Sequence, residues 1–265
     1  MNSIPISYFQ AEGNQIAYRK FGCGRSILLA FHGFGQTSQV YLPVQKQLSR
    51  EFTVFAIDLF FHGDSRYADD QLLTNQNWND LLRSFLKEQR IERFSLMGFS
   101  LGGRFALTMV EVFADCLDQL MLIAPDGITR SIWYRLATGS ALGRSTFHYV
   151  LAHLPLLTTF GHTLTRLGLL NRTAMRFAEI SLATSARREL VYKSWTQFRL
   201  IQPDLKLISK NLNDRAIRVR FFTGAYDRIV PGSYILPLTK RLQHYELAVL
   251  ETGHNHLIEL AGERL

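Results

Sequence analysis

The chain has 265 residues, of which 47% are hydrophobic and 20% charged, so it can bury a sizeable core and is not disordered throughout. Thirty Lys and Arg against 22 Asp and Glu give a net charge of +8, which allows an acidic partner without selecting one. Cys23 and Cys116 lie far apart, in no pattern typical of a disulfide framework or a zinc site. The sequence shows no signal-peptide pattern and no run of 18 apolar residues, so we expect a soluble, cytoplasmic protein.

Short apolar runs typical of buried strands alternate with amphipathic runs typical of helices through the first half of the chain. The expected strands are a hairpin of 4–10 and 15–21, followed by 26–31, 52–58, 94–98 and 117–124. The expected helices are 39–49, 77–89 and 102–114. Strands joined by helices of this length predict a mostly parallel sheet.

The alternation stops after Pro125, and helical segments without a buried strand follow. The elements expected once it resumes are strands at 217–223 and 245–250, a helix near 234–242 and a short terminal helix. A helical insertion within one sheet explains this order better than two independent domains. We therefore predict an α/β core of 1–126 and 216–265, with an eight-stranded sheet and helices on both faces, and a helical insertion at 127–215.

The excess positive charge belongs to this insertion. Residues 127–215 contain 13 basic and four acidic residues, a net charge of +9, which leaves −1 for the rest of the chain. The basic residues are interleaved with leucines and aromatic residues, which makes an amphipathic, cationic layer. This interleaving, together with the absence of a recognised binding motif, argues against nucleic acid as a partner.

A serine stands between two glycines at the end of the strand expected at 94–98, in Gly98-Phe99-Ser100-Leu101-Gly102. On a tight strand-to-helix turn this pattern exposes the serine hydroxyl in a strained backbone. The pentapeptide alone is a weak signal, but its position between a buried strand and a helix strengthens it. We expect Ser100 to be a nucleophile.

A serine needs a base, and the base needs an acid that holds it in one tautomer. Asp227 and His254 each follow a predicted strand, in the order serine, acid, histidine that this architecture requires. Asp126 is the rival acid, at the end of the preceding strand. His256 is the rival base, but we expect it to face outward from the terminal helix.

The segment His32-Gly33-Phe34-Gly35 directly follows the strand expected at 26–31. A tetrahedral oxyanion needs preorganised N–H donors, and we expect these to be the backbone amides of Phe34 and Leu101. His32 is a tempting base, but before a glycine turn we expect it to bind loop backbone instead.

Together these motifs resemble the α/β-hydrolase fold superfamily, in particular its capped serine hydrolases. The likeness spans nearly the whole chain and rests on five motifs in the same order: HGFG, DLFFHGDS, GFSLGG, GAYDRIVP and GH. The resemblance implies that Ser100 is the nucleophile, His254 the base and Asp227 its orienting acid, with the insertion as a cap over the pocket. A serine at the elbow argues against the relatives with an aspartate nucleophile, and the resemblance implies no metal or cofactor.

One motif departs from the family pattern, because Phe60 and Phe61 replace the usual small pair in DLFFHGDS. We expect the turn to form through Gly63 and to serve a structural role. The two rings, together with Phe34 and Trp133, are the candidate substrate-binding residues.

The leading function is hydrolysis of an ester or other acyl bond through an acyl-enzyme, on an apolar or anionic substrate. The aromatic cap favours an ester or lipid, and its arginines suggest an anionic substrate or an anionic membrane surface. One alternative is a carbon–carbon hydrolase or lyase acting on a small carboxylate. A second is a ligand-binding receptor on the same fold. The sequence leaves the exact substrate and the oligomeric state open.

Overall fold

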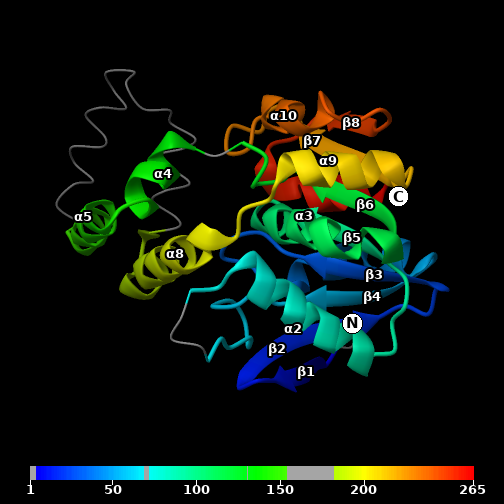
Figure 1. Cartoon of the computed structure of the whole chain (residues 1–265), viewed down its shortest axis with the longest axis horizontal. Coiled ribbons are helices and arrows are strands. Elements are labelled where there is room, and N and C mark those ends of the chain that lie inside the picture. Colours follow the sequence, from blue (N-terminus) through cyan, green and yellow to red (C-terminus); the bar gives the residue numbers. More distant parts are fainter. Residues whose placement is uncertain (1–3, 69–71, 130, 154–181) are drawn as a thin grey trace. The chain divides into compact units, whose positions relative to one another are not determined.

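The computed structural model describes residues 4–68, 72–129, 131–153 and 182–265. By its internal contacts the chain divides into two compact units: unit 1 comprises residues 1–129 and 200–265, and unit 2 comprises 130–199. The elements are coloured along the chain in Figure 1.

Eight strands form one sheet in unit 1, in the order β1-β2-β4-β3-β5-β6-β7-β8. They are β1 (Ile6–Ala11), β2 (Asn14–Phe21), β3 (Ser26–Phe31), β4 (Phe52–Ile57), β5 (Phe94–Phe99), β6 (Leu117–Ile123), β7 (Arg218–Gly224) and β8 (Glu246–Leu250). The β1–β2 and β2–β4 pairs are antiparallel, and all the others are parallel. The predicted eight-stranded, mostly parallel sheet is confirmed.

Helices cover both faces of this sheet, as predicted. Those of unit 1 are η1 (Ser38–Val44), α1 (Gln45–Leu48), α2 (Asn75–Glu88), α3 (Leu101–Phe113), η2 (Ala114–Cys116), α9 (Leu205–Asp214), η4 (Gly232–Ile235), α10 (Leu236–Thr239), η5 (His254–His256) and α11 (Leu257–Gly262). Successive strand residues point to opposite faces, so strands that are buried on both faces are apolar at most positions. All six residues of β5 are buried.

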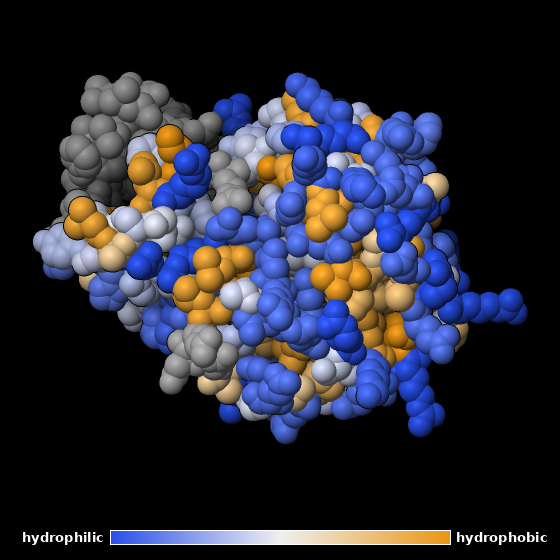
Figure 2. All heavy atoms as spheres, viewed as in Figure 1, coloured by the Kyte–Doolittle hydropathy of each residue, from blue (hydrophilic) through white to orange (hydrophobic). Residues whose placement is uncertain are grey.

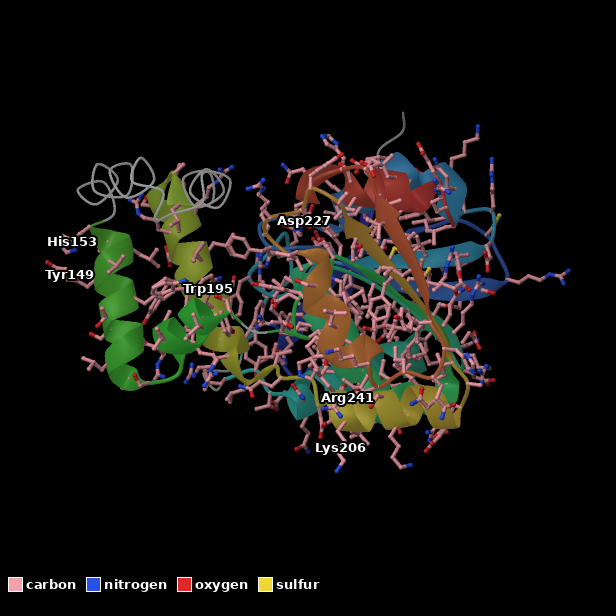
Figure 3. All side chains as sticks on the ribbon, turned by 90° about the horizontal axis from the view of Figure 1, so that it is seen from above. Tyr149, His153, Trp195, Lys206, Asp227 and Arg241 are labelled. Carbon is pink, nitrogen blue, oxygen red and sulfur yellow. The ribbon has the colours of Figure 1, made fainter. Side chains whose placement is uncertain are left out.

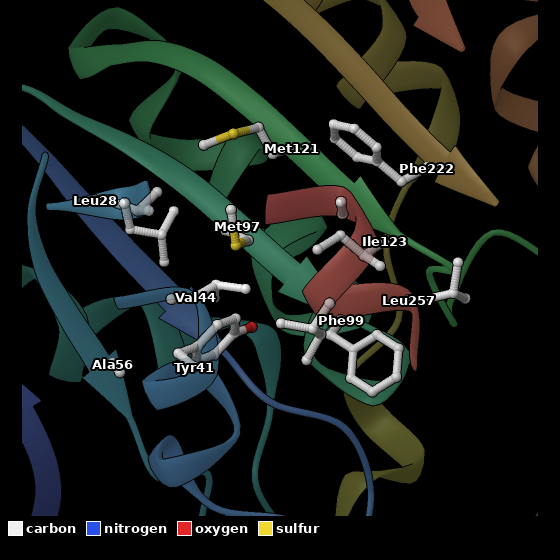
Figure 4. Packing of buried hydrophobic residues seen from close by; sticks show 14 of the residues in the cluster. Leu28, Tyr41, Val44, Ala56, Met97, Phe99, Met121, Ile123, Phe222 and Leu257 are labelled. Carbon is white, nitrogen blue, oxygen red and sulfur yellow. The ribbon is translucent and has the colours of Figure 1, made fainter. Parts of the chain in front are cut away.

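One half of the core lies between the sheet and the helices η1, α1 and α11. Figure 4 shows Met97 and Phe99 of β5 in this layer, together with Tyr41 and Leu257 from the covering helices. On the other face the indole of Trp78 on α2 packs edge-on against Phe105 of α3, with ring centroids 4.9 Å apart. The two layers fix β5 and the start of α3 from both sides.

Two helices differ from the sequence prediction, and each contains a proline. The helix expected at 39–49 is a 3₁₀ helix, η1, with Pro43 inside it, followed by the single turn of α1. The helix expected at 234–242 is likewise a 3₁₀ turn followed by α10, which contains Pro237. Proline has no N–H to donate to the preceding turn, so a continuous α-helix is disfavoured at both places.

Unit 2 contains α4 (Ile132–Thr138), α5 (Ala141–Ala152) and α8 (Ser185–Gln197), and the 3₁₀ turn η3 (Phe198–Leu200) lies at its end. The unit is shorter than the insertion expected at 127–215, because α9 belongs to unit 1. The side chain of Asn211 on α9 donates a hydrogen bond of 3.1 Å to the carbonyl of Val110 on α3. No helix in the described part of the chain is long and apolar enough to span a bilayer.

Candidate active site

Ser100 occupies a sharp turn between β5 and α3. Its backbone has φ +50° and ψ −116°, a strained conformation for a residue with a side chain. The turn is possible because glycines flank it: a Cβ on Gly102 would lie 2.0 Å from the carbonyl oxygen of Phe31. The predicted strained elbow is therefore present, with Ser100 at its apex.

Hydrogen bonds fix both backbone groups of this serine. The Ser100 N–H donates to the carbonyl of Ile123 at 2.9 Å. Its carbonyl accepts from the N–H of Gly103 at 2.9 Å and from the N–H of Asp126 at 2.8 Å. The elbow is thus tied to the end of the neighbouring strand β6, which limits how far Ser100 can shift.

His254 and Asp227 are directly joined. The Nδ1 atom of His254 lies 2.6 Å from Oδ2 of Asp227, and the other carboxylate oxygen accepts from the N–H groups of Ile229 and Val230, each at 2.9 Å. Asp227 lies in the turn after β7 (Figure 3), and its side chain is fully buried. A carboxylate oxygen accepts hydrogen bonds, so Nδ1 is the donor of this pair and Nε2 is the ring nitrogen that can take up a proton in the neutral imidazole. This is the tautomer that a general base requires.

The ring of His254 contacts the ring of Phe99, the residue before Ser100. The Phe99 ring lies 5.0 Å from the His254 ring, at an interplanar angle of 30°. Among the described residues no hydrogen bond joins Ser100 Oγ to His254. Such bonds are often long in ligand-free sites and tighten when the substrate is bound. Two of the three predicted residues are therefore bonded to each other, and the residue next to the third is in ring contact with His254.

The rival acid Asp126 has other partners. Its Oδ2 forms an ion pair with Arg104 of α3, and its Oδ1 accepts from the N–H of Gly127 at 2.7 Å. Sequence reasoning missed Arg104, although it directly follows Gly103 in the elbow motif. The rival base His256 is exposed, as expected.

His32 is buried and bonded to loop backbone, as predicted. Its Nδ1 lies 2.7 Å from the carbonyl oxygen of Gly33, and its Nε2 accepts from the N–H of Leu59 at 2.9 Å. Burial, and to a smaller extent the neighbouring His62, together lower the pKa of His32 to about 3. Both ring nitrogens are engaged, so His32 is not available as a catalytic base.

The two expected oxyanion donors are backbone amides without an acceptor among the described residues. Leu101 is the first residue of α3, where N–H groups have no partner inside the helix. Phe34 follows Gly33 in the loop after β3, and its ring lies edge-on to His62 at 5.6 Å. Both N–H groups are therefore free to donate hydrogen bonds to an oxyanion.

The DLFFHGDS segment forms a structural turn. Asp58 accepts from the N–H of Ser38 at 2.6 Å, and a Cβ on Gly63, at φ +54°, would lie 2.0 Å from the Asp58 carboxylate. Phe60 is only 1% exposed, and its ring packs at 5.0 Å from Tyr67 and edge-on at 6.2 Å from Trp78. Phe60 therefore belongs to the core.

The other candidate substrate contacts have more accessible positions. Phe61 is half-buried, with φ +65°, and Phe34 is also half-buried. Trp133 lies in unit 2, on α4. In the part of the chain that the structure describes, no three His, Cys, Asp or Glu side chains gather closely enough to hold a metal ion.

Comparison with known proteins supports the same fold. An uncharacterized protein of Mycobacterium tuberculosis is 34% identical over 137 residues, which cover 50% of this chain and 39% of that protein. The pimeloyl-[acyl-carrier protein] methyl ester esterase of Nitrosomonas europaea is 31% identical over 109 residues, 40% of each chain. The chain thus spans about two fifths of the length of these curated relatives.

Solved structures match over almost the whole chain. A thermophilic esterase from Thermogutta terrifontis superposes with a TM-score of 0.66 and 18% identity, covering 98% of this chain and 93% of that one. A likeness at this identity shows the fold. The family model described as alpha/beta hydrolase fold matches residues 26–260, which include β3, the elbow and both residues of the His254–Asp227 pair. The chain belongs to the alpha/beta hydrolase fold family.

Proposed function

We propose that this protein is a serine hydrolase that cleaves an ester or other acyl bond through an acyl-enzyme. The observation that supports this most strongly is the 2.6 Å hydrogen bond between His254 and Asp227, in the same unit as the strained elbow of Ser100. The relatives named esterases favour a carboxylic ester as the substrate.

In the first half of the reaction Ser100 Oγ attacks the carbonyl carbon of the substrate and Nε2 of His254 takes the hydroxyl proton. The buried Asp227 stabilises the imidazolium that forms. The carbonyl oxygen, on which negative charge develops, accepts hydrogen bonds from the backbone N–H groups of Phe34 and Leu101. Collapse of this intermediate expels the alcohol, which receives the proton from His254.

In the second half water attacks the ester of Ser100. His254 now takes a proton from the water, and the same two amides donate to the second oxyanion. When this intermediate collapses, His254 returns the proton to Ser100 Oγ, the bond between Ser100 and the acyl group breaks, and the acid product leaves. The half-buried rings of Phe34 and Phe61 in unit 1 are the proposed contacts for an apolar acyl chain. The route needs no metal or cofactor, because the side chains and amides supply the base and the electrophilic stabilisation.

The test is hydrolysis of p-nitrophenyl esters from acetate to palmitate by the wild type and Ser100→Ala. Ser95→Ala is the matched control: Ser95 lies on β5, the strand that leads to Ser100, it is buried, and its hydroxyl has no hydrogen-bond partner among the described residues. We expect the wild type and Ser95→Ala to share one chain-length optimum and Ser100→Ala to be inactive.

Three outcomes are informative. Full activity of Ser100→Ala would contradict the proposal. If the wild type cleaves no ester but a fluorophosphonate still labels Ser100, the nucleophile is active and a carbon–carbon bond becomes the better candidate substrate. If Ser100 is not labelled at all, a ligand-binding receptor becomes the better explanation.

A further inference from the structure

An apolar face of α4 in unit 2 is open to solvent. Ile132, Trp133 and Leu136 are 63%, 72% and 60% exposed. Residues at positions i, i+1 and i+4 lie on one side of an α-helix, so the three side chains form a continuous strip. The other side of α4 is packed: the hydroxyl of Tyr134 donates to the carbonyl of Trp195 at 3.1 Å.

The next helix of unit 2 carries a further exposed leucine. Leu142, at the start of α5, is 79% exposed. Figure 2 shows hydrophobic residues at the positions of α4 and α5, beside strongly hydrophilic ones. We call Ile132, Trp133, Leu136 and Leu142 the α4–α5 face. Large apolar side chains gathered on a surface mark an interaction site more often than isolated ones do.

The charge of unit 2 indicates the partner. Residues 130–199 contain ten basic and two acidic residues, so this unit has a net charge of +8 and the rest of the chain is neutral. Arg135 lies on α4 itself and is exposed. In the described part of the unit the one acidic side chain, Glu189, is paired with Lys193 at 2.7 Å. No free carboxylate there opposes an anionic surface.

We propose that the α4–α5 face docks on an anionic lipid bilayer, with its apolar side chains among the acyl chains and its cations at the headgroups. A tryptophan beside leucines and arginines is the composition of interfacial membrane segments. A second copy of the chain fits less well, because two units of charge +8 repel each other. The inference rests on the proposed function and extends it, since it makes a membrane lipid the class of ester.

The test is cosedimentation with phosphatidylcholine vesicles, with and without phosphatidylglycerol, at low and high salt. The variants are Leu136→Asp and Leu142→Asp, and Leu247→Asp is the matched control, because Leu247 is an exposed leucine on β8 of unit 1. Trp133 serves as a reporter through quenching by brominated lipid, since Trp78 is buried and Trp195 half-buried. Hydrolysis of p-nitrophenyl acetate is measured in parallel.

We expect the wild type and Leu247→Asp to bind only the anionic vesicles, and salt to weaken that binding. Each of the two α4–α5 variants should bind about tenfold more weakly and keep wild-type turnover of the soluble ester. Absence of wild-type binding, or equal binding by all variants, would overturn the inference. A wild-type dimer in light scattering that Leu136→Asp disrupts would overturn it in favour of a second copy. Vesicle binding without any Ser100-dependent hydrolysis would leave the docking standing and overturn the proposed function alone.

Discussion

The two units of this protein bury and expose different kinds of surface. Unit 1 is electrically neutral, and its sheet is buried on both faces between helices. Unit 2 has ten basic and two acidic residues and leaves Trp133 and Leu142 exposed. Every member of the proposed triad lies in unit 1.

This difference suggests that unit 1 carries the chemistry and that unit 2 carries the surface for a partner. A nucleophile, a base and an acid must be held within a few tenths of an ångström, which rigid strand ends and buried hydrogen bonds provide. The surface that meets a partner instead needs exposed apolar area and charge, which a helical insertion can offer without disturbing the sheet. If this division is correct, substitutions in unit 1 affect chemistry and those on the α4–α5 face affect binding.

The largest expected effect is loss of the base. His254→Ala should lower kcat/KM for a p-nitrophenyl ester by about 10⁴-fold or more, because no other group takes the Ser100 proton. His256→Ala in unit 1 and His148→Ala in unit 2 are the matched controls and should retain activity. Comparable losses in His148→Ala would mean that the chemistry is not confined to unit 1.

The next effect separates the two candidate acids. Asp227→Asn should lower kcat by about 10⁴-fold, because an amide favours the wrong tautomer of His254. Asp126→Asn should lower kcat less than tenfold, since the Asp126 carboxylate is bound to Arg104 rather than to the histidine. Its main effect should be a lower melting temperature, because the buried Arg104 loses its counter-ion. Steady-state kinetics and thermal denaturation of both variants check this ranking, and the reverse order in kcat would reassign the acid.

A smaller effect concerns how the stability of unit 1 depends on pH. Burial depresses the pKa of His32 to about 3, and burial also lowers the pKa of His62. The unfolded chain therefore binds more protons than the folded one below the ordinary histidine pKa of about 6.5. Stability is complete above that pH and falls as the pH drops towards 3. For His32 alone the free energy of unfolding should fall by about 2 kcal/mol between pH 7 and pH 5.

Urea denaturation at the two pH values measures this loss. His32→Asn should be less stable at pH 7, because the loop bonds to Gly33 and Leu59 are altered, but its stability should depend less steeply on pH. An unchanged pH dependence in this variant would show that His32 is not the group that titrates.

The smallest effect tests whether the units unfold separately. Thr74 caps α2 in unit 1 and Thr184 caps α8 in unit 2, each through a side-chain oxygen that accepts from a backbone N–H. Replacing either threonine by alanine should cost about 1 kcal/mol. In amide exchange, Thr184→Ala should speed exchange in α8 and leave β5 unchanged, whereas equal acceleration in both elements would indicate one cooperative unit.

The strands and the elbow could be predicted because their signals are local. The apolar run at 94–98 and the glycines around Ser100 dictate the buried strand and the tight turn without reference to distant residues. The breaks in the helices that contain Pro43 and Pro237 could also have been predicted from the local sequence, because proline disfavours a continuous α-helix.

Long-range partners were not predictable in this way. The pairing of Arg104 with Asp126 joins residues 22 positions apart, and nothing in either local sequence specifies it. The amphipathic pattern of α9 likewise predicts a helix but not its neighbour, so its packing against α3 through Asn211 could only come from the structure. The exposure of the α4–α5 face could not be predicted from the sequence either, because a leucine in a helix does not indicate whether another element covers it.

The most direct test of the account is the site of covalent labelling by a fluorophosphonate, identified by peptide mass spectrometry in the wild type and in His254→Ala. The account predicts a single modified peptide with the label on Ser100, formed rapidly in the wild type and much more slowly in the variant. Labelling on any other serine, or equally fast labelling of Ser100 without His254, would contradict it.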